Sequence, residues 1–444
     1  MRVLMLCLLV IAATAQTHAE NWPQWRGPSG SAVSTERNLP ERWDGTSGIA
    51  WTAPLRVRGI STPVVWGDRV FITSQVGAGA LREGNHPTLV QGGTAQDAGE
   101  RALGLDEETR DAKVLFLVEA FRRGDGGLLW TFELPAEGEL PGVHEKHNLA
   151  SASPVTDGER VYAIFGTGQM VAVDMSGKRA WQRNLAEEYG AFQISWGHGS
   201  SPIVYKDLVI LPCYHEPASY LLALDRRTGE TRWRVERESE VLSYSTPLLV
   251  ESASGDELVL NSSQGIEAYD PSTGKALWHM DEPNRFPIPT PVHHDDVIYA
   301  SRGYRSGPYA AIRTGGRGDI AASHVLWNVP TGAPYIASLV YYDGLLYMAG
   351  DVGVVTCIDA KTGERVWQER IDGIFTASPV AGDGKIYLVS ETGETIVMRA
   401  GRTPDLLARN PIDGRLLASP AISGGWLFLR TDDSLVAVSG QAMG

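Results

Sequence analysis

Apolar residues recur along the chain in short runs that are separated by tight turns. Val161-Tyr162-Ala163 and Ile386-Tyr387-Leu388 are two such runs, each just after a turn rich in glycine and aspartate. Turns of this kind occur at Gly67-Asp68, Asp157-Gly158, Lys206-Asp207, Asp343-Gly344 and Asp383-Gly384. Short Gly/Asp turns between apolar runs favour β-hairpins. The pattern therefore predicts an all-β chain built from antiparallel hairpins.

A small residue, usually followed by proline and an apolar residue, marks the start of each hairpin. These anchors begin at Thr62, Ser153, Ser201, Thr246, Thr290, Ser378 and Ser419, and a copy without proline begins at Ser338. From Ser153 onward they lie 40 to 48 residues apart. Repeats of this length are typical of four-stranded propeller blades. The eight anchors therefore predict an eight-bladed β-propeller of four-stranded antiparallel blades.

Most repeats end on a tryptophan that follows a glycine by four residues. In one copy Asp225 and Gly229 lead to Trp233. We expect the aspartate to bond turn amides, the glycine to take a positive φ, and the indole to lie between blades. The tryptophans assigned this docking role are Trp51, Trp130, Trp181, Trp233, Trp278, Trp327 and Trp367. The seventh repeat is degenerate and has Leu407 near the expected position.

The last repeat ends before a fourth strand, and the N-terminal region contains a candidate to replace it. Residues 49–55, which include Trp51, precede the first anchor and are predicted to pair with the last blade and close the ring. Closure leaves no long exposed sheet edge. The predicted organisation is one propeller over 49–440, with an N-terminal extension at 20–48 packing on it. A Gly-rich, then charged insertion at 75–112 is either a functional lid or disordered.

The first 19 residues have the pattern of a secretory signal. Arg2 precedes an apolar run that is too short to span a bilayer, and the favoured cleavage site is Thr17-His18-Ala19. Cys7 lies inside the apolar run rather than after it, which argues against a lipoprotein signal. We therefore expect a periplasmic or secreted monomer with no membrane span.

Charge and cysteine content restrict the partners and the crosslinks. The formal net charge of −14 disfavours nucleic acid as a partner. Cys213 falls in the third repeat and Cys357 in the sixth, so their separation around the ring exceeds the about 7 Å limit for bridged Cα atoms. Two free and mostly buried thiols are predicted.

The repeats resemble those of the pyrroloquinoline-quinone (PQQ)-like propeller superfamily. The pattern Ala-x-Asp-x-x-Thr-Gly-x-x-x-Trp at 223–233 and 268–278, and its variant at 357–367, is similar to the tryptophan-docking motif of that superfamily. The stretches 22–28 and 61–70 resemble a subgroup of uncharacterised exported bacterial members. The superfamily includes quinone-dependent dehydrogenases and the propeller lipoprotein of the outer-membrane β-barrel assembly machinery.

The residues that the dehydrogenases of this superfamily use are not found here. The sequence has no adjacent cysteine pair, no C-x-x-C-H haem site and no matching set of calcium ligands. No catalytic residue, metal site or cofactor is therefore predicted. His293-His294-Asp295-Asp296 falls in a hairpin turn and is interpreted as solvated rather than metal-binding. The arginine-rich run 301–319 is interpreted as either an anion-recognising loop or a solvated one.

Aromatic, imidazole and polar residues precede several anchors, on the approach to the central channel. The predicted channel-mouth ligand site comprises His147, Asn148, Trp196, His198, Tyr244, Phe286, Arg302, Tyr335 and Phe375. Such a ring suits stacking on a sugar or a peptide, although inter-blade packing is the alternative. The predicted function is an exported, non-catalytic binding scaffold that presents the mouth to a protein, peptide or glycan in the periplasm. The alternative is a PQQ-dependent oxidoreductase, with calcium, acting on alcohols or sugars.

Overall fold

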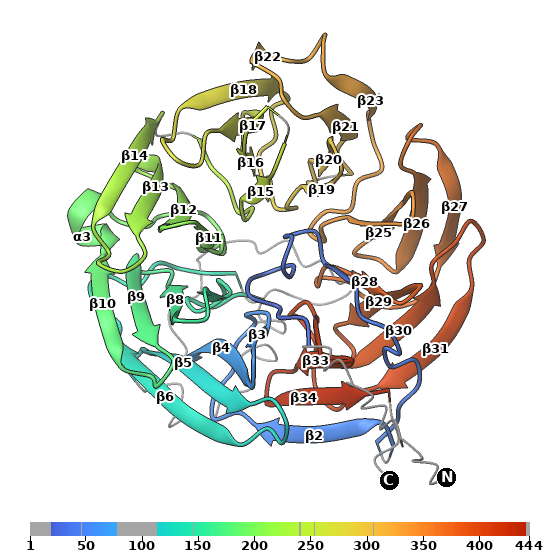
Figure 1. The fold of residues 1–444 in the computed structure, drawn as a ribbon, viewed down its shortest axis with the longest axis horizontal. Helices are drawn as coiled ribbons and strands as arrows, with labels where there is room; N and C mark the ends of the chain where they lie inside the picture. The colour runs from blue at the N-terminus through green and yellow to red at the C-terminus, as the bar shows by residue number, and fades with distance from the viewer. Residues whose placement is uncertain are drawn as a thin grey trace, which may run out of the picture.

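Eight small sheets stand in a ring around a central axis (Figure 1). The computed structural model describes residues 19–45, 47–77, 113–144, 146–238, 241–252, 254–304 and 306–440. Each sheet contains four antiparallel strands, and two sheets gain a short parallel strand at one edge. The predicted eight-bladed β-propeller is confirmed. Residues 1–18 of the predicted signal and 78–112 of the predicted insertion lie outside the described residues.

The blades follow one another along the chain. Blade 1 comprises β3 (Val64–Trp66), β4 (Arg69–Val76), β5 (Leu115–Arg122) and β6 (Leu128–Pro135). Blade 2 comprises β7 (Val155–Thr156), β8 (Arg160–Ile164), β9 (Gln169–Asp174) and β10 (Arg179–Asn184), which leads into helix α3 (Leu185–Tyr189). Blade 3 comprises β11 (Ile203–Tyr205), β12 (Leu208–Tyr214), β13 (Ser219–Asp225) and β14 (Thr231–Arg237). Blade 4 comprises β15 (Leu248–Val250), β16 (Glu257–Asn261), β17 (Gly265–Tyr269), β18 (Ala276–Asp281) and the added β22 (Gly318–Asp319).

The second half of the ring repeats this arrangement. Blade 5 comprises β19 (Val292–His294), β20 (Val297–Ser301), β21 (Tyr309–Arg313) and β23 (Val325–Val329). Blade 6 comprises β24 (Val340–Tyr342), β25 (Leu345–Ala349), β26 (Val354–Asp359) and β27 (Arg365–Arg370). Blade 7 comprises β28 (Val380–Gly382), β29 (Lys385–Ser390), β30 (Glu394–Arg399), β31 (Leu406–Pro411) and the added β1 (Val33–Ser34). Blade 8 comprises β32 (Ala421–Ser423), β33 (Trp426–Arg430), β34 (Ser434–Ser439) and β2 (Ile49–Pro54).

Burial along each blade follows the order of its strands. All seven residues of β12 are buried, because neighbouring blades cover both faces of the middle strands. In the outermost strand β14, exposed and partly buried residues alternate, as expected for a strand with one face toward solvent. The hydrophobic core is therefore distributed between successive blades rather than concentrated at the centre.

The ring is closed by the N-terminal strand, as predicted. Strand β2 pairs antiparallel with β34, with Trp51 opposite Ala437, and the Leu55 amide extends the pairing to the Asp433 carbonyl at 2.8 Å. Arg430 of blade 8 crosses to blade 1, where it donates hydrogen bonds to the Thr73 carbonyl and the Ser74 hydroxyl. The last blade is thus completed by residues from the other end of the chain.

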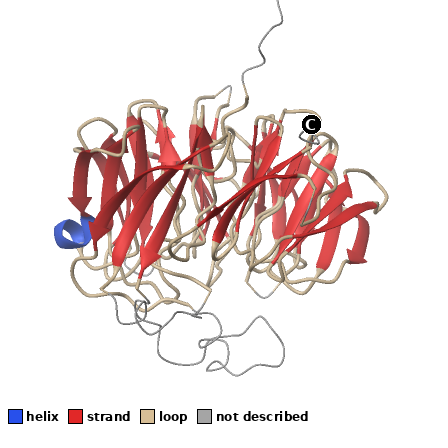
Figure 2. Ribbon diagram, turned by 90° about the horizontal axis from the view of Figure 1, so that it is seen from below, coloured by secondary structure: helices blue, strands red, loops and turns tan. Residues whose placement is uncertain are grey.

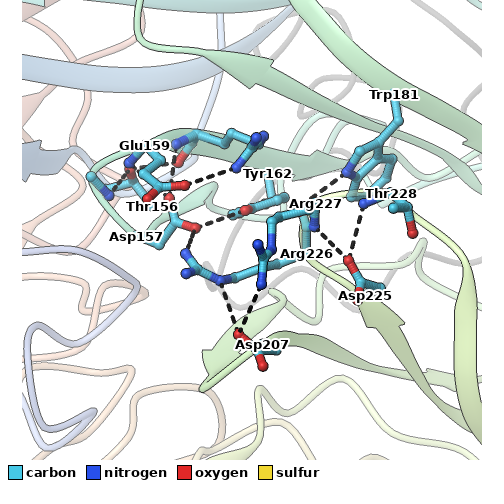
Figure 3. Close-up of polar contacts among 12 residues, drawn as sticks. Thr156, Asp157, Glu159, Tyr162, Trp181, Asp207, Asp225, Arg226, Arg227 and Thr228 are labelled. Atoms are coloured by element: carbon cyan, nitrogen blue, oxygen red, sulfur yellow. Dashed lines mark hydrogen bonds and ion pairs between the residues drawn. The ribbon is translucent and has the colours of Figure 1, made fainter.

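The junction between blades 2 and 3 shows how one repeat contacts the next (Figure 3). The Trp181 indole donates to the Arg226 carbonyl of blade 3 at 3.1 Å, and the Arg226 side chain pairs with Asp157 of blade 2. An Asp225 carboxylate oxygen accepts the Thr228 amide at 3.1 Å and holds the turn that presents this carbonyl. The same hydrogen bond, from an indole N–H to a backbone carbonyl of the next blade, is made by Trp51, Trp130, Trp327 and Trp367.

The turn glycines have a steric role that their spacing in the sequence does not reveal. Gly229 has a φ of +75°, and a Cβ placed on it would lie 2.7 Å from the Trp181 ring of the preceding blade. The same contact joins Gly126 to Trp51, Gly177 to Trp130, Gly274 to Trp233 and Gly363 to Trp327. These glycines thus serve both a left-handed turn and a close indole contact.

Blade 7 departs from this pattern. The residue in the register of the tryptophans is Ala408, which lies opposite Val397, so the equivalent position is one residue beyond Leu407. Trp43 of the N-terminal extension is buried beside this strand, and its amide donates to Asn410 at 2.9 Å. A segment from outside the repeats therefore packs on the strand that has no tryptophan of its own.

Cys213 and Cys357 are both free and buried, as predicted. Cys213 lies in β12 and Cys357 in β26, three blades apart. Within the described part of the chain, no helix has the length and hydrophobicity that a membrane crossing requires.

The strands run between two faces of the ring (Figure 2). One, the turn face, carries the hairpin turns between first and second strands, such as Gly67 and Gly424. The other, the mouth face, carries the connections from each fourth strand to the next blade, including α3. Residues 22–34 run across the centre of the ring and use the free edges of innermost strands. They pair with Val65 of blade 1, Thr156 of blade 2 and Ala381 of blade 7.

Candidate functional site

A central cavity of about 240 Å³ is lined by residues from all eight blades and by Trp25 of the N-terminal segment. Two stacked rings make its wall, and both are formed by residues that come just before the innermost strands. The hydroxyl ring consists of the anchor residues that line the cavity: Thr62, Ser153, Ser201, Thr246, Ser338, Ser378 and Ser419. The collar lies two residues earlier in each repeat, toward the mouth face: Ile60, Ser151, Gly199, Tyr244, Ile288, Ile336, Thr376 and Leu417.

The anchor hydroxyls connect the blades. The Thr62 amide donates to the Ser153 hydroxyl at 2.9 Å, and the Ser153 amide donates in turn to Ser201 at 2.9 Å. The series continues through Thr246, Thr290, Ser338, Ser378 and Ser419 at 2.9–3.1 Å. Seven successive steps around the ring are thus joined by the same hydrogen bond, which explains why a hydroxyl residue occupies every anchor.

An aromatic rim surrounds one side of the cavity mouth. Ring centroids are separated by 5.4 Å between His144 and Trp196, and by 6.1 Å between Trp196 and Phe286. Phe286 is followed by Tyr304 at 4.9 Å, and Tyr304 by Tyr335 at 5.5 Å. The rim therefore extends without interruption from blade 2 to blade 6.

An ion pair and a carboxyl group lie at the other side of the mouth. The Lys146 ammonium, from the approach to blade 2, is 2.8 Å from Glu391 of blade 7, and both side chains are largely buried. Glu391 also accepts a hydrogen bond from Thr376. Burial raises the pKa of Asp351 to about 6, and its carboxylate accepts the Tyr335 amide at 3.1 Å. The mouth thus combines stacking surfaces with one buried ion pair and one further carboxyl group.

Three histidines near the mouth are uncharged at neutral pH. Burial lowers the pKa of His147 and of His198 to about 3, and that of His215 to about 4. His147 lines the cavity. Its ring packs against Gly199, since a Cβ placed on that glycine would lie 3.0 Å from the imidazole Nε2 atom. His198 lies behind the wall, with its ring 5.3 Å from that of Phe192.

The structure places the predicted mouth residues in two groups. His147, Trp196, Tyr244 and Tyr335 line the cavity. The remaining five lie outside its lining: Asn148, His198, Phe286, Arg302 and Phe375.

The members of the second group have internal contacts. Phe286 packs in the aromatic rim, and Phe375 is fully buried. Arg302 is buried and donates to the Gly265, Ser262 and Glu282 carbonyls. Asn148 holds its own turn, because its side chain accepts the Ala150 amide at 3.0 Å.

Several lining residues were not among the predicted ones. Trp25 reaches the cavity from a segment that precedes the repeats, and Lys146 lines it while paired with Glu391, which is 245 positions away in the chain. Spacing within one repeat cannot reveal contacts that form across the ring. The hydroxyl ring, by contrast, coincides with the anchors that had been found in the sequence.

The His293–Asp296 sequence lies at the end of β19 and in the turn that follows. The His294 ring stacks on Tyr341 at 4.1 Å, while His293 contacts Ser31 of the N-terminal segment. Adjacent residues therefore point to different partners. The described residues contain no group of three or more His, Cys, Asp or Glu side chains that could hold a metal ion.

The fold and the repeat pattern define the class of the protein as an eight-bladed propeller of PQQ-like repeats. A family model described as "Outer membrane protein assembly factor BamB" matches residues 116–318, 318–403 and 353–442. Since these matches cover more than half of the chain, the protein belongs to this family.

Curated relatives are similar at low identity. The outer membrane protein assembly factor BamB of Moranella endobia is 23% identical over 72% of this chain and 79% of its own length. The tetrathionate hydrolase of Acidithiobacillus ferrooxidans is 24% identical over 62% of this chain, and the match spans only 53% of that enzyme.

Solved structures share the fold. BamB from Moraxella catarrhalis matches with a TM-score of 0.54 and 18% identity, covering 73% of this chain and 88% of that one. The quinohemoprotein alcohol dehydrogenase of Comamonas testosteroni matches with a TM-score of 0.64 and 14% identity, covering 96% and 81%. Because both a named assembly factor and a named dehydrogenase have this architecture, the fold alone does not select between binding and catalysis.

Proposed function

We propose that the protein is an exported, non-catalytic binding scaffold whose channel mouth receives a segment of a protein, peptide or glycan. The observation that carries the proposal is the mouth itself, a concave cavity with a continuous aromatic rim and one buried ion pair. Stacking surfaces beside a few polar groups are typical of recognition sites. The family relationship to proteins named assembly factors supports a binding role.

The rigidity of the ring supports the same role. The rim residues stand on connections whose ends are fixed by the hydroxyl ring, so the stacking surfaces are held in place before a partner arrives. Preorganised contact surfaces lose less conformational entropy on binding. Because the protein is acidic, such a mouth would select its partner by shape and stacking rather than by electrostatic attraction of an anionic partner.

A calcium-bound quinone is the alternative that the dehydrogenase neighbours suggest, and the cavity does not suit it. PQQ is a tricarboxylate, and calcium is held by several oxygen ligands. Among the lining residues, Lys146 is the one lysine or arginine, and it already pairs with Glu391. The adjacent cysteine pair used by the dehydrogenases of this superfamily is not formed by Cys213 and Cys357, because they lie in separate blades. The dehydrogenase function therefore remains the second candidate, supported by fold similarity alone.

The proposal is tested by measuring binding to a displayed random-peptide library and to a glycan array. We expect selected ligands to lose about 5- to 30-fold in affinity with Trp196→Ala or Tyr335→Ala, because each change removes a stacking surface worth about 1–2 kcal/mol. Trp426→Ala, which removes an indole from the turn face, is the matched control and should leave affinity unchanged.

Two outcomes would contradict this assignment. The mouth is not the binding site if the Trp196→Ala and Tyr335→Ala variants retain wild-type affinity. A second outcome is co-elution of PQQ absorbance with the protein in gel filtration after incubation with calcium, together with dye-reducing activity, which would favour the oxidoreductase.

A further inference from the structure

The Glu36 carboxylate holds the backbone nitrogen of Glu20 against blade 8. Its Oε1 atom accepts hydrogen bonds from the Glu20 backbone N–H at 2.7 Å and from the Gly424 amide at 2.7 Å. Its Oε2 atom accepts the Gly425 amide at 2.6 Å. Gly424 and Gly425 form the turn between β32 and β33. One side chain therefore joins the Glu20 nitrogen to the last blade of the ring.

The other polar groups of Glu20 are fixed in the same place. Its carbonyl accepts the Ser423 hydroxyl of blade 8 at 2.6 Å, and its carboxylate accepts the Ser34 hydroxyl at 2.6 Å. Two residues further along the chain, Trp22 pairs with Val65 of blade 1. Glu20 is therefore a point at which the N-terminal segment is attached to the turn face.

The two carboxylates at this point have no cationic partner within the described part of the chain. No Lys, Arg or His nitrogen lies within 4.0 Å of the carboxylate of Glu20 or of Glu36. Arg37 and Arg123 border the same surface depression, but Arg37 is 4.0 Å from Asp383 and Arg123 contacts a hydroxyl of blade 8. The negative charge of Glu36 is therefore met by backbone N–H groups alone.

The cleavage site that the sequence predicts lies directly before this nitrogen, after Ala19. In that step a signal peptidase adds water across the Ala19–Glu20 amide. The carboxylate of Ala19 leaves with residues 1–19, and Glu20 retains an amine that is protonated at neutral pH. The nitrogen 2.7 Å from Oε1 of Glu36 thus changes from a neutral amide into an ammonium group. The cleavage pattern and the carboxylate contact are independent observations that concern the same atom.

We propose that cleavage after Ala19 creates an ammonium group at Glu20 whose ion pair with Glu36 fixes the N-terminal segment to the turn face. Hydrogen bonds between charged groups are about twice as strong as those between neutral ones. The fixed segment pairs with blades 1, 2 and 7 and carries Trp25 to the cavity, so processing stabilises the turn-face side of the cavity. The inference rests on the export stated in the proposed function, but not on ligand binding at the mouth.

The first test determines where the exported protein begins. The full chain is expressed with its own residues 1–19 in a bacterial host, recovered from the periplasm and the medium, and measured by intact mass. We expect a chain that begins at Glu20. A start at any other residue overturns the proposal, because the nitrogen that faces Glu36 would then remain a neutral amide or be absent.

The second test compares the chain that begins at Glu20 with one that carries a short Gly-Ser extension before Glu20, which keeps the N–H donor but removes its charge. Amide hydrogen exchange in residues 22–36 reports how firmly the segment is held. Glu36→Gln should speed exchange in both chains, because an amide is a weaker acceptor than a carboxylate, but at least threefold more in the chain with the free ammonium. Glu41→Gln alters a carboxylate of the same extension, 3.5 Å from Arg42, and is the matched control that should leave exchange in these residues unchanged.

Equal effects of Glu36→Gln in the two chains would overturn the ion pair, since the charge of the Glu20 nitrogen would then have no influence. The difference between the chains should also shrink at about 1 M salt, because partly exposed charges are screened. A difference that salt leaves unchanged would contradict an electrostatic origin. Ligand binding that survives Trp196→Ala would refute the proposed mouth without affecting any of these measurements, so the failures of the two proposals are distinguishable.

Discussion

At the scale of single residues, burial determines which protonation states the folded protein accepts. His198 is enclosed between Phe192 and His215, and its pKa falls to about 3 because a charged imidazole would be desolvated. The unfolded chain binds a proton at this position near pH 6.5. The stabilising contribution of neutral His198 is therefore complete above pH 6.5 and is lost as the pH falls toward 3.

We accordingly expect the Tm to fall between pH 6.5 and pH 4, with His147 and His215 adding to the effect of His198. The change in unfolding free energy is about 1–3 kcal/mol per histidine over this window. Asp351 acts in the opposite direction, because its raised pKa of about 6 favours the folded state in acid. A His198→Phe variant should show a smaller fall in Tm, whereas the exposed control His279→Phe should follow the wild type. Equal slopes in all three proteins would exclude burial of His198 as a cause.

The limits of sequence reasoning are also visible at this scale. Trp196, Tyr244 and Tyr335 could be predicted as lining residues, since each stands just before an anchor and the anchors mark the channel. His198 and Phe375 have similar positions, yet their side chains turn into the wall between blades. Adjacent residues of one connection can face opposite directions, and one-dimensional spacing does not encode that choice.

At the scale of elements, the contact between an indole and a glycine of the next blade sets how closely blades approach. Gly229 and Gly344 have nearly equal φ values of +75° and +78°, but Gly229 faces the Trp181 ring whereas a Cβ on Gly344 would meet open space. The two positions therefore separate backbone strain from steric contact between blades.

We expect Gly344→Ala to lower the free energy of unfolding by about 1 kcal/mol, which is the cost of a side chain at positive φ. Gly229→Ala should cost about 1–3 kcal/mol more, because the indole must move away. Chemical denaturation of both variants measures the difference. Equal losses would show that the indole contact has no energetic role.

The elements themselves were largely predictable, because hairpin turns and repeating anchors are local signals. The lack of a tryptophan in the seventh repeat was visible in the sequence, but its packing partner was not, since Trp43 reaches β31 from the N-terminal extension, far away in sequence. The route of residues 22–34 across the axis was equally hidden, because it depends on free strand edges that exist only once the ring has formed.

At the scale of the whole molecule, closure produces both the rigid ring and the cavity. Strand β2 completes blade 8, and the N-terminal segment that precedes it provides Trp25 on the turn-face side of the cavity. Ligand access is thereby expected at the mouth face alone. The repeat count and the closing strand could be derived from the sequence, whereas this difference between the two faces required the structure.

Hydrogen–deuterium exchange of the protein with and without a peptide or glycan selected for tight binding tests this central claim most directly. The account predicts slower amide exchange in residues 146–152 and 331–338 at the mouth face, and unchanged exchange in residues 66–69 and 383–385 at the turn face. Protection confined to the turn face would contradict it.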